Sequence, residues 1–393
     1  MKRVGAQHID AVEDSVQFAM MKALDSWSRT HTPDNPNAWL YQVAYHHLLS
    51  EFRTSSRRQK LLDEQQPNAS AMLAEQVEPP LPSEMEDSML RMIYVACHEG
   101  IPLESQLVFT LKTLCGFSVK EIALRLFITQ ANVYKRFSRA KTYLKSAPHA
   151  LDDLTYSDMT ARLPMVHKVL YLMFTEGHLS SHSDLVIRKD LCEEAIRLAQ
   201  RISQSKIGET PETYALLSLM CFHLARIDSR QNKSGTLLLL EDQDRSLWNN
   251  ELIEKGMSYL GQAAFGEGLS RYHLEASIVA EHCMAVSYKS TRWDNIVRLY
   301  KLLEQVEPSV MHRLNQAIAM AEWQGSDAGL AVMQTMNAPS WLIRSYHWNA
   351  VMADLQYRSG QVASAKANEE QALNKAPTES IRTSLMQRFK KYS

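Results

Sequence analysis

Several features that define common protein classes are missing from this sequence of 393 residues. It has only five cysteines, an odd number with no C-x-x-C pair, so neither a disulfide framework nor a zinc finger is expected. It has no signal-peptide pattern and no apolar run long enough to cross a bilayer. We therefore expect a protein of the reducing cytoplasm, without a membrane partner.

Motifs that carry catalysis are also missing, because the sequence has no P-loop, no G-x-S-x-G and no H-E-x-x-H. Cys97 and His98 are adjacent and could suggest a metal site. Side chains of adjacent helical residues point to different sides, however, and no complementary ligand cluster is evident. We therefore predict that the chain is not an enzyme and needs no cofactor or metal.

Glycine is scarce, with 13 residues, and strand-like alternation is nearly absent, whereas 45% of the residues are hydrophobic. An all-α fold of two or three domains is expected. The net charge of −1 means that any nucleic-acid contact must come from a local basic face. Residues 101–145 provide one, with eight Lys or Arg against two acids.

Residues 63–87 differ from their surroundings, with seven acidic residues, four prolines and no Lys or Arg. Such a composition cannot bury enough apolar surface to become ordered. We predict a flexible linker between two helical segments.

A helix-turn-helix pattern lies at residues 118–141. Ser118 and Glu121 form a capping box, and Thr129 can cap the next helix. At about 100° per residue, one side of that helix is apolar and carries Val133, Phe137, Ala140 and Leu144. The opposite side carries an amide and three cations, Asn132, Lys135, Arg136 and Arg139. Such groups hold phosphates and read base edges, so we predict a DNA recognition helix; the alternative is a solvated basic surface.

A second basic helix is predicted to begin after the N-cap Asn35, with Pro36 at its first position. Its apolar stripe consists of Tyr41, Tyr45, Leu48, Leu49 and Phe52. Another side carries an aromatic ring among polar and basic groups, namely Trp39, Gln42, His46, Arg53, Arg57 and Arg58. This combination suits single-stranded DNA, because a freed base needs a ring to stack on and its backbone needs a cation. A core position for Trp39 is equally compatible with the pattern.

An amphipathic helix is predicted at residues 11–24. Its packing stripe consists of Val12, Val16 and Ala19. Its outward side consists of Asp14, Gln17, Phe18 and Met21. Exposed apolar groups beside an acid and an amide suggest a protein partner, the alternative being a frayed surface helix.

Together these segments resemble a bacterial sigma factor of the extracytoplasmic-function type, within the sigma-70 family. The resemblance rests on AVEDSVQFAMMKAL, then DNPNAWLYQVAYHHLLSEFRTSSRR, then the acidic linker and LESQLVFTLKTLCGFSVKEIALRLFITQANVYKRFSRAKTYL. It covers residues 8–147. It implies sigma region 2 at 1–62, the linker at 63–87 and the region 4 helix-turn-helix at 88–147.

The resemblance also implies the partners, which are core RNA polymerase and promoter DNA. Polymerase contact is assigned to Asp14, Gln17, Phe18 and Met21. Melting of the −10 element is assigned to Asn35, Trp39, Gln42, His46, Arg53, Arg57 and Arg58. Recognition of the −35 element is assigned to Asn132, Lys135, Arg136 and Arg139. Only eleven residues precede Val12, where the family carries about one more helix, so region 2 is expected to be shortened unless the true start lies upstream.

Residues 160–393 are predicted to form an α-solenoid of helix pairs. The segments VHKVLYLMFTEGH, DLCEEAIRL and LLLLEDQDRSLWN resemble a subgroup of these factors with a tetratricopeptide-like (TPR-like) C-terminal extension. Independently, Gly360 fits a turn, and Pro308 and Pro377 are 69 residues apart, close to two 34-residue repeats. A solenoid would present a concave surface to a regulatory protein, whereas the alternative is a plain helical bundle.

The acidic loop at 241–248 could dock on a basic domain, with Trp248 as an anchor, or merely cap a helix. Two other functions remain open for the whole chain. One is a duplex DNA-binding regulator with a TPR-like sensor domain. The other is a repeat scaffold with a vestigial sigma-like head.

Overall fold

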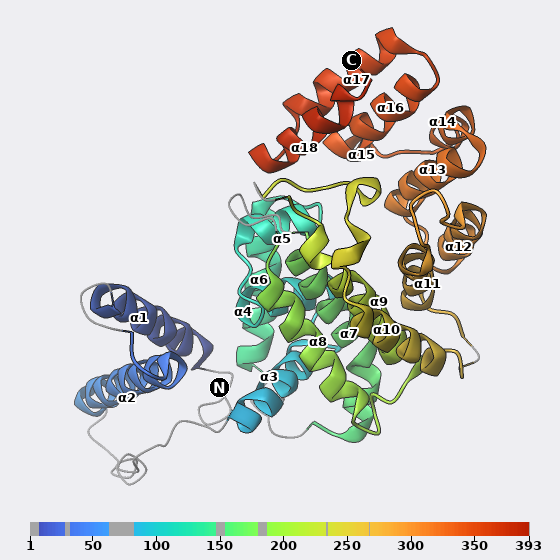
Figure 1. Ribbon diagram of the computed structural model, residues 1–393. Helices are drawn as coiled ribbons and strands as arrows, with labels where there is room; N and C mark the ends of the chain where they lie inside the picture. The colour runs from blue at the N-terminus through green and yellow to red at the C-terminus, as the bar shows by residue number, and fades with distance from the viewer. Residues whose placement is uncertain are drawn as a thin grey trace. The chain divides into compact units, whose positions relative to one another are not determined.

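The structure is a computed structural model that describes residues 8–27, 32–62, 82–146, 154–179, 187–232, 235–266 and 268–392 (Figure 1). Within these ranges the side chains of 53–62 and 82–88 are not described. The described residues form eighteen α-helices and no β-strand, so the all-α prediction is confirmed. None of these helices combines the length and apolar character that a bilayer crossing requires. The chain divides into two compact units, Met1–Val166 and His167–Ser393.

The first unit begins with a pair of helices, α1 (Ile9–Trp27) and α2 (Pro36–Leu62), which pack against each other. The ring of His8 lies 4.7 Å from that of Phe52, and the ring of Trp27 lies 5.4 Å from that of Trp39. The two helices therefore run antiparallel. Their shared core is thin, because the buried side chains facing it are small or few: Ser15, Ala19, Ala23 and Leu48.

Four further helices complete this unit before α7 (Tyr156–His178): α3 (Pro82–Ala96), α4 (Leu103–Thr113), α5 (Val119–Arg125) and α6 (Gln130–Ser146). Helices α4, α5 and α6 contact one another, and α3 contacts α4. Residues of α3, α4 and α6 meet Ile9 of α1 and Ile101 in one cluster, which consists of Ile9, Val95, Ala96, Ile101, Phe109, Ala140 and Leu144. This cluster gives α6 a fixed buried side and leaves its other side free.

The helix boundaries differ from the expected linkers in two places. Helix α3 begins at Pro82, inside the segment 63–87 that was predicted to be flexible; residues 63–81 lie outside the described residues. Proline is compatible with the first position of a helix because its missing N–H is not needed there. Helix α7 begins at Tyr156, ahead of the predicted start of the extension at residue 160, and the first unit ends within it.

The second unit continues α7 with eleven more helices, most of which contact a helix next to them along the chain. They are α8 (Lys189–Ser203), α9 (Pro211–Ala225), α10 (Asn250–Ala263), α11 (Arg271–Met284), α12 (Trp293–Val306), α13 (Val310–Gln324), α14 (Ser326–Gln334), α15 (Ser340–Ile343), α16 (Tyr346–Arg358), α17 (Val362–Asn374) and α18 (Glu379–Lys390). From α11 onward, most contacts join helices that are consecutive or separated only by the short α15, as successive helix pairs would require.

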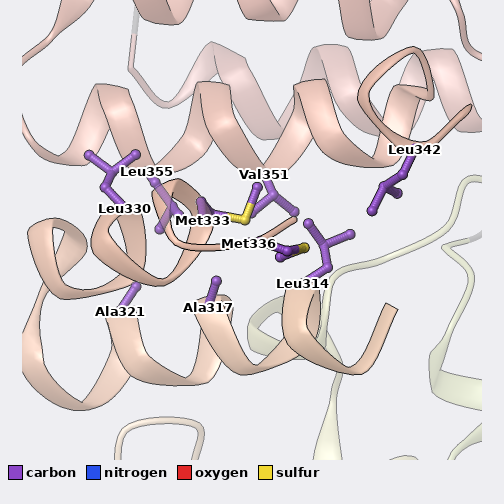
Figure 2. Close-up of a cluster of buried hydrophobic side chains, with 9 residues drawn as sticks. All are labelled: Leu314, Ala317, Ala321, Leu330, Met333, Met336, Leu342, Val351 and Leu355. Carbon is purple, nitrogen blue, oxygen red and sulfur yellow. The ribbon is translucent and has the colours of Figure 1, made fainter. Parts of the chain in front are cut away.

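Figure 2 shows how two such pairs share a core. Side chains from α13, α14, α15 and α16, and Met336 from the segment after α14, pack together there. All are buried: Leu314, Ala317, Ala321, Leu330, Met333, Met336, Leu342, Val351 and Leu355. At the α16–α17 turn, Gly360 has φ +78°, a conformation that disfavours any side chain. Ala365 and Ala372 of α17 are fully buried.

The loop that follows α9 is part of the second unit's own structure. Trp248 is only 6% exposed, and its indole N–H donates to Ser229 Oγ at 2.8 Å. Asp244 accepts from the Ser246 backbone N–H at 2.9 Å, which caps a short 3₁₀ turn. The docking role suggested for Trp248 is therefore wrong, because a buried indole anchors its own loop and cannot insert into another surface.

Candidate nucleic-acid interface

The start of α5 has the geometry that its sequence predicts. The Ser118 backbone N–H donates to Glu121 Oε2 at 2.6 Å, and the Glu121 N–H donates to Ser118 Oγ at 3.2 Å. These reciprocal bonds are a capping box, and they satisfy two donors that the first helical turn would otherwise leave unpaired. Ile122 is fully buried beneath them. The helix is thereby fixed at its first turn.

The connection between α5 and α6 contains a backbone conformation that could not be predicted from the sequence. Phe127 has φ +53° and an exposed side chain, although glycine or asparagine usually occupies such a position. Two residues later, Thr129 Oγ1 accepts the Asn132 backbone N–H at 3.3 Å and caps α6. A tight turn and a cap therefore set the direction in which α6 leaves α5.

The two sides of α6 are separated as predicted. Val133, Ala140 and Leu144 are buried, and the Phe137 ring stacks on that of Phe109 at 5.6 Å. Asn132, Lys135 and Arg139 are exposed on the other side. A buried stripe against α4 and an open polar stripe are what a helix needs to enter a DNA groove.

Arg136 differs from the other three predicted −35 residues. Its guanidinium Nη2 lies 2.6 Å from Glu104 Oε2 of α4, and its side chain is only 22% exposed. By helical position it lies on the flank of the exposed stripe, next to the buried side. An arginine already paired with a carboxylate has fewer donors for a phosphate or a base.

Two cations near the end of α6 are also engaged within the first unit. Lys141 Nζ donates to Glu13 Oε2 at 2.5 Å and pairs with Asp10, and Lys145 pairs with Asp10 as well. The hydrogen bond from Lys141, followed by that from Lys145, lowers the pKa of the Asp10 carboxyl. On α6, Lys135 and Arg139 are exposed, whereas Arg136, Lys141 and Lys145 are paired with carboxylates.

The predicted −10 residues fall into three groups. Asn35 caps α2, since its Oδ1 accepts the Ala38 N–H at 3.0 Å, and Gln42 and His46 are exposed. Trp39 is half-buried and packs against Trp27. The side chains of the remaining three lie outside those that the structure describes: Arg53, Arg57 and Arg58. The structure thus places an exposed amide, an exposed imidazole and a half-buried indole along one side of α2.

Helix α1 presents the predicted partner face. Asp14, Gln17, Phe18 and Met21 are exposed, and Met21 is 70% exposed. The packing stripe was partly wrong, because Val16 is exposed. The buried residues of the packing stripe are instead Ser15, Ala19 and Ala23. Their small side chains let α1 and α2 approach each other closely. This shift adds apolar surface to the outward side.

The exposed apolar surface of α1 is larger than the sequence pattern suggested. Besides Phe18 and Met21 it includes Val16, Met20 and Leu24. The Phe18 ring stacks on that of His47 at 4.1 Å, which holds it at the edge of α2. Contiguous exposed apolar side chains are typical of a protein-interaction surface. The spacing of four residues between Val16, Met20 and Leu24 was the signal for these additional residues, because such residues share one side of a helix.

Tyr134 is the residue of α6 that the sequence reasoning missed. It is 59% exposed, next to Lys135 on the open side of the helix. Its position directly after Val133 was the available signal, because it lies about 100° around the helix from that buried residue. A tyrosine hydroxyl can donate to a phosphate or a base edge.

The Cys97 and His98 pair shows no sign of metal ligation. Cys97 is buried, while His98 Nδ1 accepts the Gly100 N–H at 3.0 Å and lies 3.2 Å from Tyr143 Oη. Among the described residues, no three His, Cys, Asp or Glu side chains gather as a metal site would need. The two residues serve the packing and the turn between α3 and α4.

Comparison with known proteins connects the two parts of the chain to different families. Residues 91–144 match the family model "Sigma-70, region 4", and residues 162–264 match a family of unknown function, DUF6596. The "Uncharacterized protein R00370" of Rhizobium meliloti (strain 1021) is 28% identical over 371 residues, which cover 93% of this chain and 86% of that protein. No solved structure matches. The helix-turn-helix of α5 and α6 therefore lies in a segment that is similar to sigma-70 region 4.

Proposed function

We propose that this chain is a sigma factor of the extracytoplasmic-function type, which directs RNA polymerase to specific promoters and helps to melt the −10 region. The observation that carries this proposal is the exposed polar stripe of a capped, well-packed α6 inside the segment similar to sigma-70 region 4. Transcription initiation involves no catalytic step by the factor itself and no cofactor. The chain would act in the cytoplasm, where RNA polymerase works.

In this proposal α6 reads the −35 element. Arg139 and Lys135 have exposed cationic heads, and Asn132 has an exposed amide near the helix N-terminus. Phosphate contacts would position the helix, while arginine and asparagine would read guanine and adenine edges. Arg136 would contribute less, because it is held by Glu104.

Region 2 would correspond to α1 and α2. The exposed apolar side of α1, with Asp14 and Gln17 beside it, would bind the polymerase. On α2, His46 and Gln42 would contact the opened −10 strand, and the exposed part of Trp39 would stack on a freed base. The thin core between the two helices supports a need for a partner, because so small a buried surface stabilises little by itself.

The second unit would be a regulatory domain of TPR-like helix pairs. The order of its contacts, from helix to neighbouring helix, supports a solenoid, as does the left-handed glycine at the α16–α17 turn. We propose that it sets whether the sigma-like unit is active, through a protein partner or through contact with the polymerase.

The main alternative is a regulator that binds duplex DNA without polymerase. The close packing of Trp39 on Trp27 favours it, because a tryptophan used only for packing needs no single-stranded DNA. A selection from a genomic fragment library separates the two functions. The full chain is used with and without core polymerase, and retained fragments are sequenced.

A sigma factor will enrich fragments that share two motifs, and only when core polymerase is present. Enrichment of one motif by the chain alone would favour the duplex regulator. Equal recovery of all fragments in both arms would favour a scaffold with a vestigial head.

A further inference from the structure

Helix α1 makes a second contact within the first unit besides its packing on α2. Ile9, the first residue of α1, is only 2% exposed. It belongs to the same apolar cluster as Phe109 of α4 and Leu144 of α6. The pair of α1 and α2 is therefore docked on the helices of the helix-turn-helix region through the first turn of α1.

Two lysines of α6 hold the beginning of α1 by charge. Lys141 Nζ donates to Glu13 Oε2 at 2.5 Å and also pairs with Asp10, and Lys145 pairs with Asp10 as well. We call these four residues the clasp. The Asp10 side chain is 53% exposed, so water and ions reach its pairs. Such ion pairs contribute little to stability and weaken as the salt concentration rises, so the clasp can open.

Beyond the clasp, the contact between α1 and the neighbouring helices is incomplete. A cleft of about 330 Å³ remains between them. Val16 and Gln17 line it from α1, and Phe109 and Lys112 line it from α4. Stable interfaces are packed as densely as protein interiors, so a contact that leaves this space is suited to a reversible association. The proposed polymerase-binding side of α1 includes Val16 and Gln17, and it therefore borders the cleft.

The docked arrangement limits the distance between the two proposed DNA-reading surfaces. At 1.5 Å per residue, Asn132 lies about 14 Å from Lys141 along α6, and Trp27 lies about 26 Å from Asp10 along α1. The ring of Trp39 is 5.4 Å from that of Trp27. Even with about 25 Å added for the side chains that join these points, Asn132 and Trp39 are less than about 65 Å apart.

Promoter elements at −35 and −10 are further apart than this limit. Their positions differ by about 25 base pairs, which corresponds to about 85 Å along a straight duplex at 3.4 Å per base pair. The docked chain therefore cannot place α6 on one element and α2 on the other. In the sequence, only residues 63–81 lie between α2 and α3, so no described helix has to break when the pair of α1 and α2 leaves.

We propose that the clasp is an autoinhibitory contact, which holds the free chain closed and opens when RNA polymerase binds α1. This inference rests on the proposed function and adds a regulatory role for Asp10 and Glu13, which belong to neither the proposed polymerase-binding nor the DNA-binding residues. Their carboxylates neutralise lysines of α6 that the phosphates of DNA would otherwise attract.

Energy transfer between two dyes on the full chain tests the closed state. The dyes are attached to non-canonical residues at positions 50 and 138, which are exposed on α2 and α6. Both sites are near the clasp, because the Phe52 ring contacts that of His8, and Lys141 follows three residues after Ser138. We expect high transfer in the free chain at low salt, and lower transfer when salt or core RNA polymerase is added.

The variant Asp10→Asn, Glu13→Gln removes both carboxylates and nearly preserves side-chain size. It should show lower transfer in the free chain and bind core polymerase about threefold more tightly or better, because more of the chain is already open. Asp34→Asn, Glu51→Gln removes the same charge at exposed sites and should change neither quantity. Adding Lys141→Glu and Lys145→Glu to Asp10→Lys, Glu13→Lys should restore the transfer of the parent chain, which a folding defect would not allow.

Equal transfer in the parent and in Asp10→Asn, Glu13→Gln would overturn the proposal, because the clasp would not hold the chain closed. A variant that opens but binds core polymerase no more tightly than the parent would overturn it too, since the contact would then not be inhibitory. Failure of the opened variant and the parent alike to bind core polymerase would instead refute the proposed function, and the regulatory role with it. The dye measurement on the free chain distinguishes this case, because it reports on the contact without polymerase.

Discussion

Two arginines on α6 have the same charge but different surroundings. Arg139 is exposed, whereas Arg136 is 22% exposed and lies 2.6 Å from Glu104. Their spacing of three residues gave no reason to distinguish them, because the partner of Arg136 comes from α4, more than 30 residues earlier. A long-range ion pair is a tertiary property, so it could not be predicted from the pattern of one helix.

We predict that Arg139→Ala weakens binding to the −35 element more than Arg136→Ala does. Loss of a base contact should cost about 1–3 kcal/mol. Loss of a phosphate contact should reduce the slope of log K against log salt by about 0.9. Fluorescence anisotropy of holoenzyme on promoter DNA, at several salt concentrations, measures both quantities.

Arg298→Ala, at an exposed site of α12, is the matched control and should change neither the affinity nor the slope. If the folded Arg136→Ala, Arg139→Ala double variant bound as tightly as the parent, the exposed stripe of α6 would not be the DNA-reading surface.

Trp39 is expected to have two roles, because it packs on Trp27 and is still half-exposed. Trp39→Ala should spare closed-duplex binding but impair strand opening, at a cost of about 1–3 kcal/mol for one lost stacked base. Trp39→Phe keeps a ring and should retain most of the opening. Permanganate footprints of the −10 region measure strand opening directly.

The folding of α1 and α2 must be verified in these variants, since the alanine also removes a packing contact. Circular dichroism of the free protein serves this purpose. Footprints of normal strength on a folded Trp39→Ala variant would show that the indole only packs.

At the scale of elements, local rules predicted α5 and α6 well. The capping box of Ser118 and Glu121, the cap at Thr129 and the buried stripe from Val133 to Leu144 depend on residues only three or four apart. Boundaries and faces set by distant residues were predicted less well. The acidic composition of residues 63–87 led to the prediction of a flexible linker, although α3 begins at Pro82. The packing stripe of α1 was also misplaced, because Ser15 is buried in the structure and Val16 is exposed.

We predict that Ser118→Ala destabilises the first unit by about 1 kcal/mol, because the Glu121 N–H loses its acceptor at the start of α5. Urea unfolding, followed by circular dichroism, gives this free energy. Ser138→Ala, at an exposed site of α6, is the control and should be close to neutral. An unchanged free energy in Ser118→Ala would mean that the cap contributes nothing to stability.

Acid should destabilise the second unit through its buried histidines. His167 lies between α7 and α9 with its Nε2 at 2.8 Å from Thr213 Oγ1, and burial lowers its pKa to about 4. The unfolded chain takes up this proton near pH 6.5 and the folded chain does not, so stability falls as the pH drops from about 6.5 toward 4. At pH 5 the loss from His167 should be about 2 kcal/mol.

Urea unfolding at pH 7 and pH 5 tests this prediction. His167→Gln cannot take up the proton, so it should show a smaller loss of stability between the two pH values than the parent. An equal loss in the variant and the parent would assign the acid sensitivity to other groups, such as His282, whose pKa burial lowers to about 3.

At the scale of the whole molecule, we expected region 2 at 1–62, a linker at 63–87, region 4 at 88–147 and a helical extension from residue 160, and the structure divides the chain after Val166. The division falls inside α7, not at its beginning. Arg162 explains this, because it donates to the Tyr94 carbonyl at 3.3 Å and lies 3.0 Å from Glu99. The first residues of α7 therefore belong to the same unit as α3. This contact joins residues far apart in the sequence, so no local pattern predicts it.

We predict that removal of residues 167–393 changes transcription without unfolding residues 1–166. The fragment should keep its helical circular dichroism, because its apolar clusters and ion pairs lie within it. A gain of transcription would identify the second unit as an inhibitor, and a loss would identify it as a required activator. Equal transcription from the two proteins, at matched concentration on one promoter, would contradict a regulatory role.

The central claim is that the chain acts as a sigma factor, and run-off transcription tests it most directly. Core RNA polymerase is incubated with a promoter fragment from the genomic selection, with and without the full chain. We predict a transcript of defined start only when the chain is present, and much less of it with the Lys135→Ala, Arg139→Ala double variant. No transcript above that of core polymerase alone, from a chain that still binds the fragment, would contradict the claim.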